Sequence, residues 1–133
     1  MSDNMNFDLV SPERSVASFK VTNIHIPGSE GDMTAMLNHA PILTTLRPGI
    51  LSVTRADVVT EYVVTGGFAQ ITPDSVTVLA ERASEKANFT QEDMDLLLNG
   101  TKDSLNSAVE AEKDAATKTH AEVLELSITL GLN

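Results

Sequence analysis

The sequence predicts an α+β protein in two parts: an N-terminal antiparallel β-sandwich over residues 1–84 and a C-terminal antiparallel α-helical hairpin over residues 85–133. Three observations predict this. Apolar residues recur at every second position in the first part, turn residues interrupt that part at short intervals, and the apolar spacing then changes to three and four. No helical insert of ~10–15 residues separates the short runs, which favours an antiparallel sandwich over βαβ units.

The strand-like part alternates along several short runs. Phe7 and Leu9 alternate with polar neighbours, and Ile24 and Ile26 do the same further on. Alternation with period two places one face of a strand inside and the other outside. The turn signals are Ser11–Pro12, Pro27–Gly28, Asn38–Pro41, Pro48–Gly49, Gly66–Gly67 and Pro73–Asp74.

The helical part begins with a capping signal. Thr90 is followed by Asp93, which predicts an N-cap with an acid at N3. The apolar stripe behind it comprises Met94, Leu97, Leu98, Thr101, Leu105, Ala108 and Val109. It runs through Gly100, and because a continuous stripe outweighs the ~1 kcal/mol cost of a helical glycine, we expect one helix from about residue 90 to 112, with room for a bend at Gly100.

A second helix follows the polar break at residues 112–114. Ala116, Val123, Leu124 and Ile128 supply its apolar positions, and Gly131 is a natural stop. Two amphipathic helices joined by a short polar link predict an antiparallel hairpin.

Composition limits the possible classes of protein. The 133 residues are 41% hydrophobic but only 4% aromatic, so the core is expected to consist of Val, Ile, Leu and Ala. Cysteine is absent, which excludes disulfides and thiol chemistry and fits a reducing compartment. The first 25 residues carry no apolar run of the kind found in a secretory signal, and no stretch approaches the ~20 apolar residues of a membrane span.

Charge argues against a nucleic-acid partner. The net charge is −10, with −4 in residues 1–84 and −6 in residues 85–133. Binders of nucleic acid or anionic lipid usually carry the opposite sign.

The sequence offers no catalytic or metal-binding constellation. His25, His39 and His120 do not stand at ligand spacing, and no nucleophile motif of the G-x-S-x-G type occurs. His39 lies in a turn, where it either bonds to nearby backbone or contacts a partner. We therefore expect no catalytic residue, no metal and no cofactor.

The segment Gly28–Asp32 is a turn rather than a phosphate cradle. It lacks the Lys-Ser/Thr ending of a phosphate-binding loop and places Glu30 where phosphate would bind. Such a turn projects Glu30 and Asp32 outward, either as a solvated hairpin tip or as an acidic contact to a basic partner.

Taken in order, the turn motifs resemble a known family. The series is Val10–Glu13, Ile26–Asp32, Asn38–Pro41, Leu46–Gly49, Thr65–Gly67 and Asp74–Ala80. It resembles the epsilon subunit of bacterial F-type, proton-translocating ATP synthases. The resemblance covers roughly residues 8 to 83 at motif level, whereas the helical part is similar in layout more than in sequence.

The resemblance implies a β-sandwich, a helical hairpin and a non-enzymatic role. Members of this family sit at the foot of the rotating central stalk, where the sandwich binds the gamma subunit and the polar loops of the membrane c-ring. The implied place is the cytoplasmic face of the bacterial inner membrane, peripheral to the membrane through the complex.

The resemblance also implies which residues make contact. Those matching the family's contacts with c-ring and stalk are Ser11, Glu30, Gly31, Asp32, His39, Ala40 and Pro41. The family usually has Pro-Gly before its His-Ala-Pro turn, and Leu37–Asn38 stands there in this chain. Asparagine tolerates a left-handed conformation, so we expect the turn to survive.

The helical part departs further from the family. Many relatives carry an Asp-x-x-Arg-Ala motif tied to ATP binding and a basic second helix that reaches the alpha and beta catalytic subunits and inhibits hydrolysis. This chain has no arginine after Arg82, and Lys118 is the only lysine from residue 114 onward. We expect no ATP site, because triphosphate is held poorly without arginine, and weak self-inhibition.

A subunit that transmits torque needs a large interface with an apolar centre, so some outward strand residues should be apolar and exposed; Leu79 and Ile50 are candidates.

Two rival interpretations of the function remain. A free-standing ligand-binding β-sandwich predicts an internal pocket lined by the few aromatics. A small hydrolase needs a convergent acid, base and nucleophile, which the sequence does not show.

Overall fold

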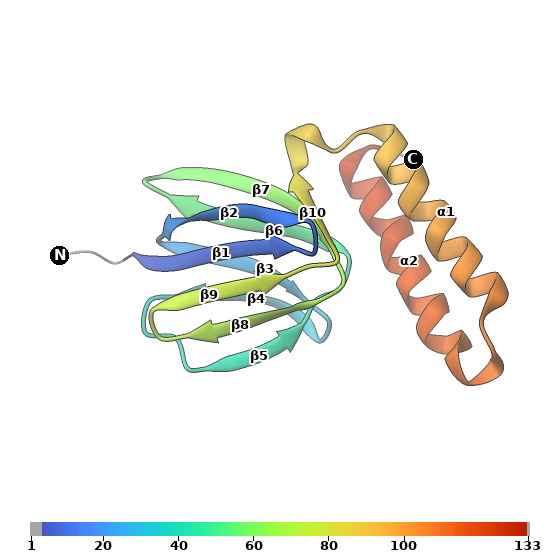
Figure 1. Cartoon of the computed structure of the whole chain (residues 1–133), viewed down its shortest axis with the longest axis horizontal. Helices are drawn as coiled ribbons and strands as arrows, with labels where there is room; N and C mark the ends of the chain where they lie inside the picture. Colours follow the sequence, from blue (N-terminus) through green and yellow to red (C-terminus); the bar gives the residue numbers. More distant parts are fainter. Residues whose placement is uncertain (1–3, 133) are drawn as a thin grey trace. The chain divides into compact units, whose positions relative to one another are not determined.

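The computed structural model describes residues 4–132 and divides into two compact units between Ala87 and Asn88. The first unit contains ten strands (Figure 1). They are β1 (Met5–Ser11), β2 (Arg14–Val21), β3 (Asn23–Gly28), β4 (Gly31–Met36), β5 (Ile42–Thr45), β6 (Gly49–Arg55), β7 (Val58–Thr65), β8 (Phe68–Thr72), β9 (Ser75–Leu79) and β10 (Arg82–Glu85). A short 3-10 helix, η1 (Lys86–Asn88), follows.

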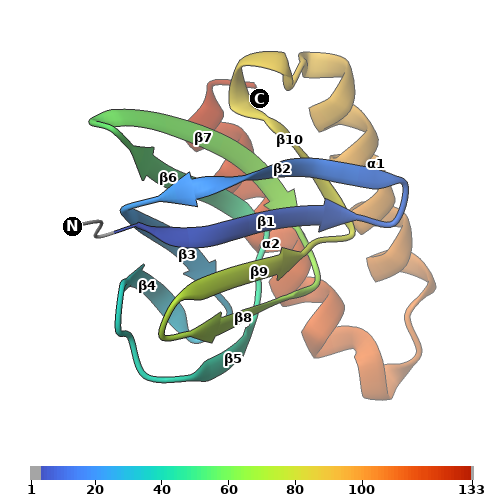
Figure 2. The same ribbon diagram turned by 60° about the vertical axis from the view of Figure 1, so that its left-hand side comes forward.

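The strands form two five-stranded sheets packed face to face (Figure 2). The first sheet has the order β2-β1-β9-β8-β5 and the second has the order β10-β7-β6-β3-β4. The predicted sandwich is thereby confirmed. One pair is not antiparallel, however, because β1 and β9 run parallel. A parallel pair requires a long crossover connection, and the strands between β1 and β9 supply it.

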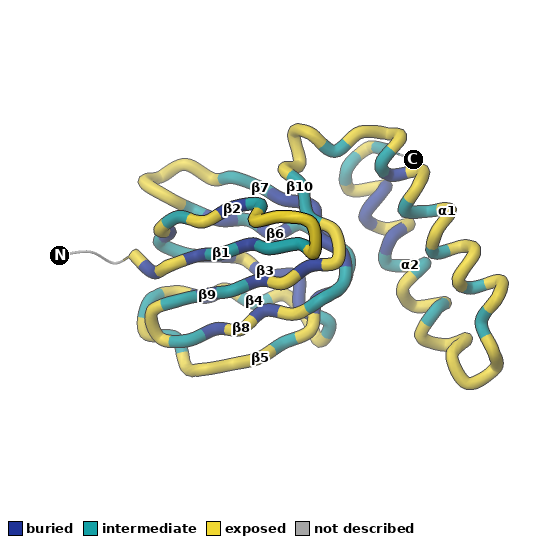
Figure 3. Tube along the Cα trace, in the orientation of Figure 1, coloured by how far each residue is buried: buried dark blue, intermediate teal, exposed yellow. Residues whose placement is uncertain are grey.

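Alternating side chains of both sheets fill the core. Along β1, Met5, Phe7 and Leu9 are buried, as the period-two pattern predicts (Figure 3). The Phe7 ring lies 5.7 Å from that of Phe19 and 6.4 Å from that of Tyr62, measured between centroids. The rest of the buried cluster is largely aliphatic, as the composition requires.

The second unit is an antiparallel helical hairpin made of α1 (Gln91–Ser107), the 3-10 turn η2 (Glu110–Glu112) and α2 (Lys113–Leu130). The predicted cap is confirmed: Thr90 accepts from the backbone of Asp93, whose carboxylate accepts from the backbone of Thr90. Gln91 donates to the carbonyl of Leu132 across 2.9 Å, which ties the start of α1 to the end of α2.

The expected extent of the first helix was wrong. We expected it to reach residue 112, but α1 ends at Ser107, and Ala108 and Val109 are extended. Val109 is 62% exposed, so a longer helix would bury no further apolar surface there. Helix α1 continues through Gly100 without a break. Helix α2 ends at Gly131, which has φ 70°, as predicted.

One side-chain contact joins the two helices midway. His120 Nδ1 lies 2.7 Å from Thr101 Oγ1, and the Thr101 hydroxyl donates to the Leu98 carbonyl. In the described part of the chain, no helix is both long and apolar enough to cross a membrane.

Candidate functional site: an acidic hairpin tip and an apolar strand row

The acidic segment found in the sequence forms the tight turn between β3 and β4. Gly28 pairs with Gly31, which leaves Ser29 and Glu30 as the two turn residues. A Cβ at Gly28 would lie 2.6 Å from the Gly31 carbonyl oxygen, and Gly31 has φ 141°. Both positions therefore require glycine. We call residues 28–32 the acidic tip.

Neighbouring strands hold the acidic tip in place. The backbone N–H of Ser29 donates to the Thr45 carbonyl at 2.8 Å, and the two hydroxyls also hydrogen-bond. In the β5–β6 connection, the backbone N–H of Arg47 donates to the Pro27 carbonyl at 3.0 Å. The Arg47 side chain donates through Nη1 to the Gly28 carbonyl at 2.7 Å and through Nη2 to the Asp32 carboxylate.

The two carboxylates of the acidic tip have different surroundings. The hydrogen bond from Arg47 lowers the pKa of Asp32; partial burial opposes this, and nearby His25 assists it. His25 Nε2 lies 3.4 Å from Asp32 Oδ2, and its Nδ1 lies 3.3 Å from Thr34 Oγ1. Glu30 is exposed, and its side chain has no hydrogen-bond or ion-pair partner among residues 4–132.

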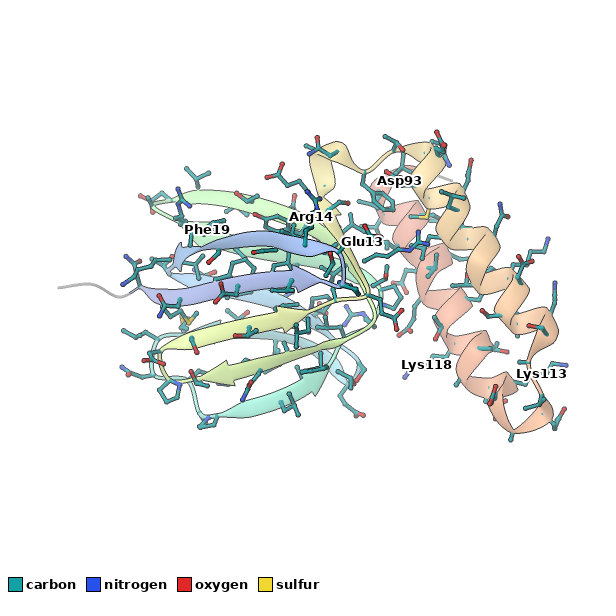
Figure 4. The ribbon with its side chains drawn as sticks, viewed as in Figure 1. Glu13, Arg14, Phe19, Asp93, Lys113 and Lys118 are labelled. Carbon is teal, nitrogen blue, oxygen red and sulfur yellow. The ribbon has the colours of Figure 1, made fainter. Side chains whose placement is uncertain are left out.

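Strand register places Ser11 at the same end of the sandwich as the acidic tip. Ser29 bonds to Thr45, Thr45 pairs with Phe68, and Phe68 pairs with Leu79. Leu79 pairs in turn with Val10, the neighbour of Ser11. Ser11 closes the β1–β2 turn by pairing with Arg14, and Figure 4 labels Glu13 and Arg14 there.

The His39–Ala40–Pro41 turn lies at the opposite end of the sandwich. The backbone N–H of Asn38 donates to the carbonyl of Pro73, in the β8–β9 turn that lies at that end. Asn38 has φ 68°, so it adopts the left-handed conformation expected of it. His39 Nδ1 donates to the Ala40 carbonyl at 2.7 Å, which confirms the interpretation of a turn histidine bonded to backbone. The seven predicted contact residues therefore form two separate groups.

An apolar row crosses the outer face of the first sheet. Phe68 and Leu79 are each 39% exposed and directly opposite one another, and Val10 pairs with Leu79 on its other side. On β5 the residue opposite Phe68 is Thr45, and Leu43, two positions away on the same face, is more exposed still. The expected exposure of Leu79 is confirmed. Ile50, on the second sheet, was also expected to be exposed but is half-buried. We call Val10, Leu43, Phe68 and Leu79 the apolar row.

Phe68 and Leu43 were not predicted as contact residues. The signal for Phe68 was present: Ala69 and Ile71 are buried, so the opposite parity places Phe68 and Gln70 outward. A large aromatic side chain at an outward strand position is a candidate for a contact surface. Leu43 had no such signal, because the four-residue β5 is too short to show a period.

Two hollows in the first unit do not resemble a ligand pocket. One is lined by Val59, Thr60, Glu61, Glu85, Lys86 and Ala87, and another by Ser11–Arg14 and Glu81–Ala83. Both are open and neither has an aromatic lining, whereas Phe7 and Tyr62 are buried in the core. Within residues 4–132, no group of three or more His, Cys, Asp or Glu side chains could hold a metal ion.

Comparison with known proteins agrees with this architecture. Residues 4–86 match the family model of the ATP synthase delta/epsilon chain β-sandwich domain. The ATP synthase epsilon chain of Jannaschia sp. (strain CCS1) is 48% identical over 126 residues, covering 95% of this chain and 93% of the relative. That of Ruegeria sp. (strain TM1040) is 54% identical over 110 residues, covering 83% of this chain and 80% of the relative.

Solved structures share the fold at low identity. A chain of the OSCP/F1/c-ring part of the Euglena gracilis mitochondrial ATP synthase aligns with a TM-score of 0.74 at 22% identity, covering 100% of this chain and 84% of that chain. One from the central stalk and c-ring of the Tetrahymena thermophila enzyme aligns with a TM-score of 0.71 at 15% identity and 94% coverage of both. The match over the whole sandwich and the high identity of near full-length relatives show that this chain belongs to the ATP synthase epsilon chain family.

Proposed function

We propose that the chain is a non-catalytic rotor subunit of a proton-translocating ATP synthase, which links the gamma subunit to the c-ring. One observation carries the proposal: a single β-sandwich presents two surfaces of different chemistry, the acidic tip and the apolar row. Structural neighbours come from assemblies described as containing F1, central stalk and c-ring, which supports these partners in general. The comparisons do not support the alternative of a free-standing ligand-binding protein.

The acidic tip is the proposed contact with the c-ring. Its residues Glu30, Gly31 and Asp32 lie at the end of a braced hairpin, and Ser11 lies at the same end of the sandwich. Polar, partly basic loops would be attracted to an acidic tip, and complementary charge fixes the register of such a contact.

The apolar row is the proposed contact with the gamma subunit. Exposed side chains on a flat sheet face suit burial in a lasting interface, because such interfaces have an apolar centre. His39, Ala40 and Pro41 lead directly into β5, the edge strand of the same sheet. We assign this turn to the border of the stalk contact rather than to the c-ring contact.

The chain itself catalyses nothing under this proposal. It sits at the cytoplasmic face of the bacterial inner membrane and is peripheral to the membrane through the complex. The hairpin reaches the alpha and beta catalytic subunits weakly and holds no ATP, because its excess of acids over bases opposes both contacts.

Binding to purified partners tests this function. The full chain is mixed separately with isolated gamma subunit and with isolated c-ring, and complexes are detected by size-exclusion chromatography. We expect a complex with gamma, and a ternary complex when the ring is added. A chain that binds neither partner, or that turns over a substrate by itself, would overturn the proposal.

A further inference from the structure

Helix α2 carries an exposed stripe in addition to the face that it turns toward α1. Leu124 is 44% exposed and Ile128 is 67% exposed. Two further exposed residues continue the line toward the start of the helix, Ala121 and Thr117. His120, which contacts α1, is not part of this line. We call Thr117, Ala121, Leu124 and Ile128 the α2 stripe.

The spacing of the α2 stripe is that of a coiled-coil seam. Its members follow one another by four, three and four residues, which is the interval between the two core positions of successive heptads. Such a seam is covered by the seam of a second helix. A second copy of this chain brings an identical seam, and two identical surfaces meet in an isologous pair with two-fold symmetry.

Two charged residues border the α2 stripe along one edge. Lys118 and Glu125 lie seven residues apart, so they occupy the same heptad position, next to the core positions. Both are exposed, and neither has an ion-pair partner among residues 4–132. Figure 4 shows Lys118 pointing away from α1. This edge is therefore free to meet another helix.

These charges select one direction of pairing. When two copies of α2 run antiparallel with Ala121 facing Leu124 of the second copy, Lys118 of each copy comes opposite Glu125 of the other. In a parallel pair the two edges lie on opposite sides of the seam, so neither charge would be paired. Antiparallel helices also place each macrodipole beside the opposite end of its neighbour, which adds to the preference.

We propose that the free chain associates with a second copy of itself through the two α2 stripes, in an antiparallel pair whose direction is set by two Lys118–Glu125 ion pairs. Because a seam of two heptads is far smaller than the ~1,000 Å² of a stable interface, its dissociation constant falls at roughly 0.1–1 mM. The net charge of −10 on each copy opposes association. Salt screens this long-range repulsion more than it screens ion pairs in contact.

Sedimentation equilibrium of the full chain over concentrations up to ~1 mM at ~0.15 M salt tests the pairing. The weight-average mass of the wild type should rise from 14.2 kDa toward twice that value. Ile128→Ser removes the most exposed side chain of the α2 stripe and should weaken association about tenfold. Leu96→Ser is the matched control, since Leu96 is 57% exposed but lies on α1, and it should associate as the wild type does. Circular dichroism should show wild-type helix content in both variants.

Charge reversal separates the ion pairs from general repulsion. Glu125→Lys makes the chain less negative, so repulsion alone predicts tighter association. The proposed pairing predicts association at least about fivefold weaker, because each Lys118 would then face a lysine. The double variant Lys118→Glu/Glu125→Lys has the wild-type net charge and restores both pairs in reverse, so it should associate as the wild type does.

Four results would overturn the inference. A wild-type chain that stays monomeric at ~1 mM has no such seam contact. A Glu125→Lys variant that associates as well as the wild type, or better, would show that charge acts only through general repulsion. A double reversal that fails to regain the association lost in Glu125→Lys would exclude the antiparallel register. An equal loss in Leu96→Ser and Ile128→Ser would remove the contact from the α2 stripe.

Discussion

Arg47 and Asp32 form an ion pair across the neck of the β3–β4 hairpin, and the same guanidinium also bonds to the Gly28 carbonyl. The pair links a residue of the β5–β6 connection to the second arm of the hairpin. A two-residue turn of this kind would otherwise be free to bend at its neck. The tip is therefore held as a projection from the sandwich, as the proposed contact with the c-ring requires.

The first prediction concerns the pH dependence of folding. The pKa of Asp32 is lowered in the folded protein, chiefly by the hydrogen bond from Arg47, so the ionised carboxylate stabilises the fold. This contribution is complete above the unfolded pKa of about 4 and is lost as the pH falls through the lower folded value. Because Asp32 and Arg47 are both partly exposed, it should stay below about 1 kcal/mol.

Urea unfolding of wild type and Asp32→Asn at pH 6 and at pH 3 checks this. The free energies of unfolding of the two proteins should differ at pH 6 and begin to converge at pH 3. Arg47→Gln should show the same convergence, since it removes the partner. A constant difference between wild type and Asp32→Asn across the pH range would contradict the prediction.

The second prediction compares two glycines. Gly67 has φ 89°, and a Cβ there would lie 1.8 Å from the carbonyl oxygen of Leu79, a backbone atom of the neighbouring strand. Gly67→Ala should lower the free energy of unfolding by on the order of 3 kcal/mol. At Gly100, inside α1, a Cβ would meet nothing within 4 Å, so Gly100→Ala should stabilise the protein by up to about 1 kcal/mol.

Thermal and urea unfolding of both variants give the measurement, and each variant serves as the control for the other. If both alanine substitutions changed the free energy of unfolding equally, the backbone conformation at Gly67 would not be the cause of the expected loss.

The third prediction addresses the apolar row. Leu79→Ser removes an outward side chain that is 39% exposed in the free chain, so the fold should lose little. Binding to the gamma subunit should weaken about tenfold, because burial of one Leu side chain contributes roughly 1.5–3 kcal/mol. Isothermal titration calorimetry with purified gamma measures the effect.

Val58→Ser is the matched control, since Val58 is 63% exposed but belongs to the second sheet. It should leave the affinity for gamma unchanged. An equal loss in both variants would mean that the row is not the contact.

Most of the fold could be predicted from the sequence because the apolar spacing of a strand or helix is a property of residues that are close in the chain. Alternation placed Phe7 and Leu9 inside, and the Thr90 cap and the Gly131 stop marked two helix ends. The parallel pairing of β1 with β9 was not predictable in this way, since it joins segments more than sixty residues apart. The end of α1 was missed because the apolar spacing continued through Ala108 and Val109, although no partner covers Val109.

The candidate site was predictable only in part for the same reason. The turn residues at the tip and at His39 follow from local chemistry, and the structure confirms both turns. The two turns lie at opposite ends of the sandwich because β4 spans the distance between them. The order of the motifs along the sequence does not indicate this separation. The bracing of Asp32 by Arg47 joins residues fifteen positions apart, so no local pattern indicated it.

The last prediction concerns the helical unit. Residues 88–133 carry nine acidic side chains against three lysines and no arginine (Figure 4 labels Lys113 and Lys118 on α2). A triphosphate would find no planar cation here, and any acidic partner surface would repel α2. We therefore expect no ATP binding in the micromolar range by calorimetry, and an increase of less than about twofold in ATPase rate when residues 88–133 are deleted from the reconstituted complex.

A gain-of-charge variant shows whether charge is the reason. Glu122→Lys with Glu125→Lys places lysines at two positions about one turn apart on α2, one half-buried and one exposed. If like-charge repulsion keeps the hairpin from the catalytic subunits, this double variant should inhibit ATP hydrolysis, and high salt should relieve the inhibition. Glu122→Gln with Glu125→Gln removes the repulsion without adding attraction and should have a smaller effect. A several-fold rise in ATPase rate on deletion of the wild-type hairpin would show instead that an acidic hairpin inhibits by a contact that does not depend on charge.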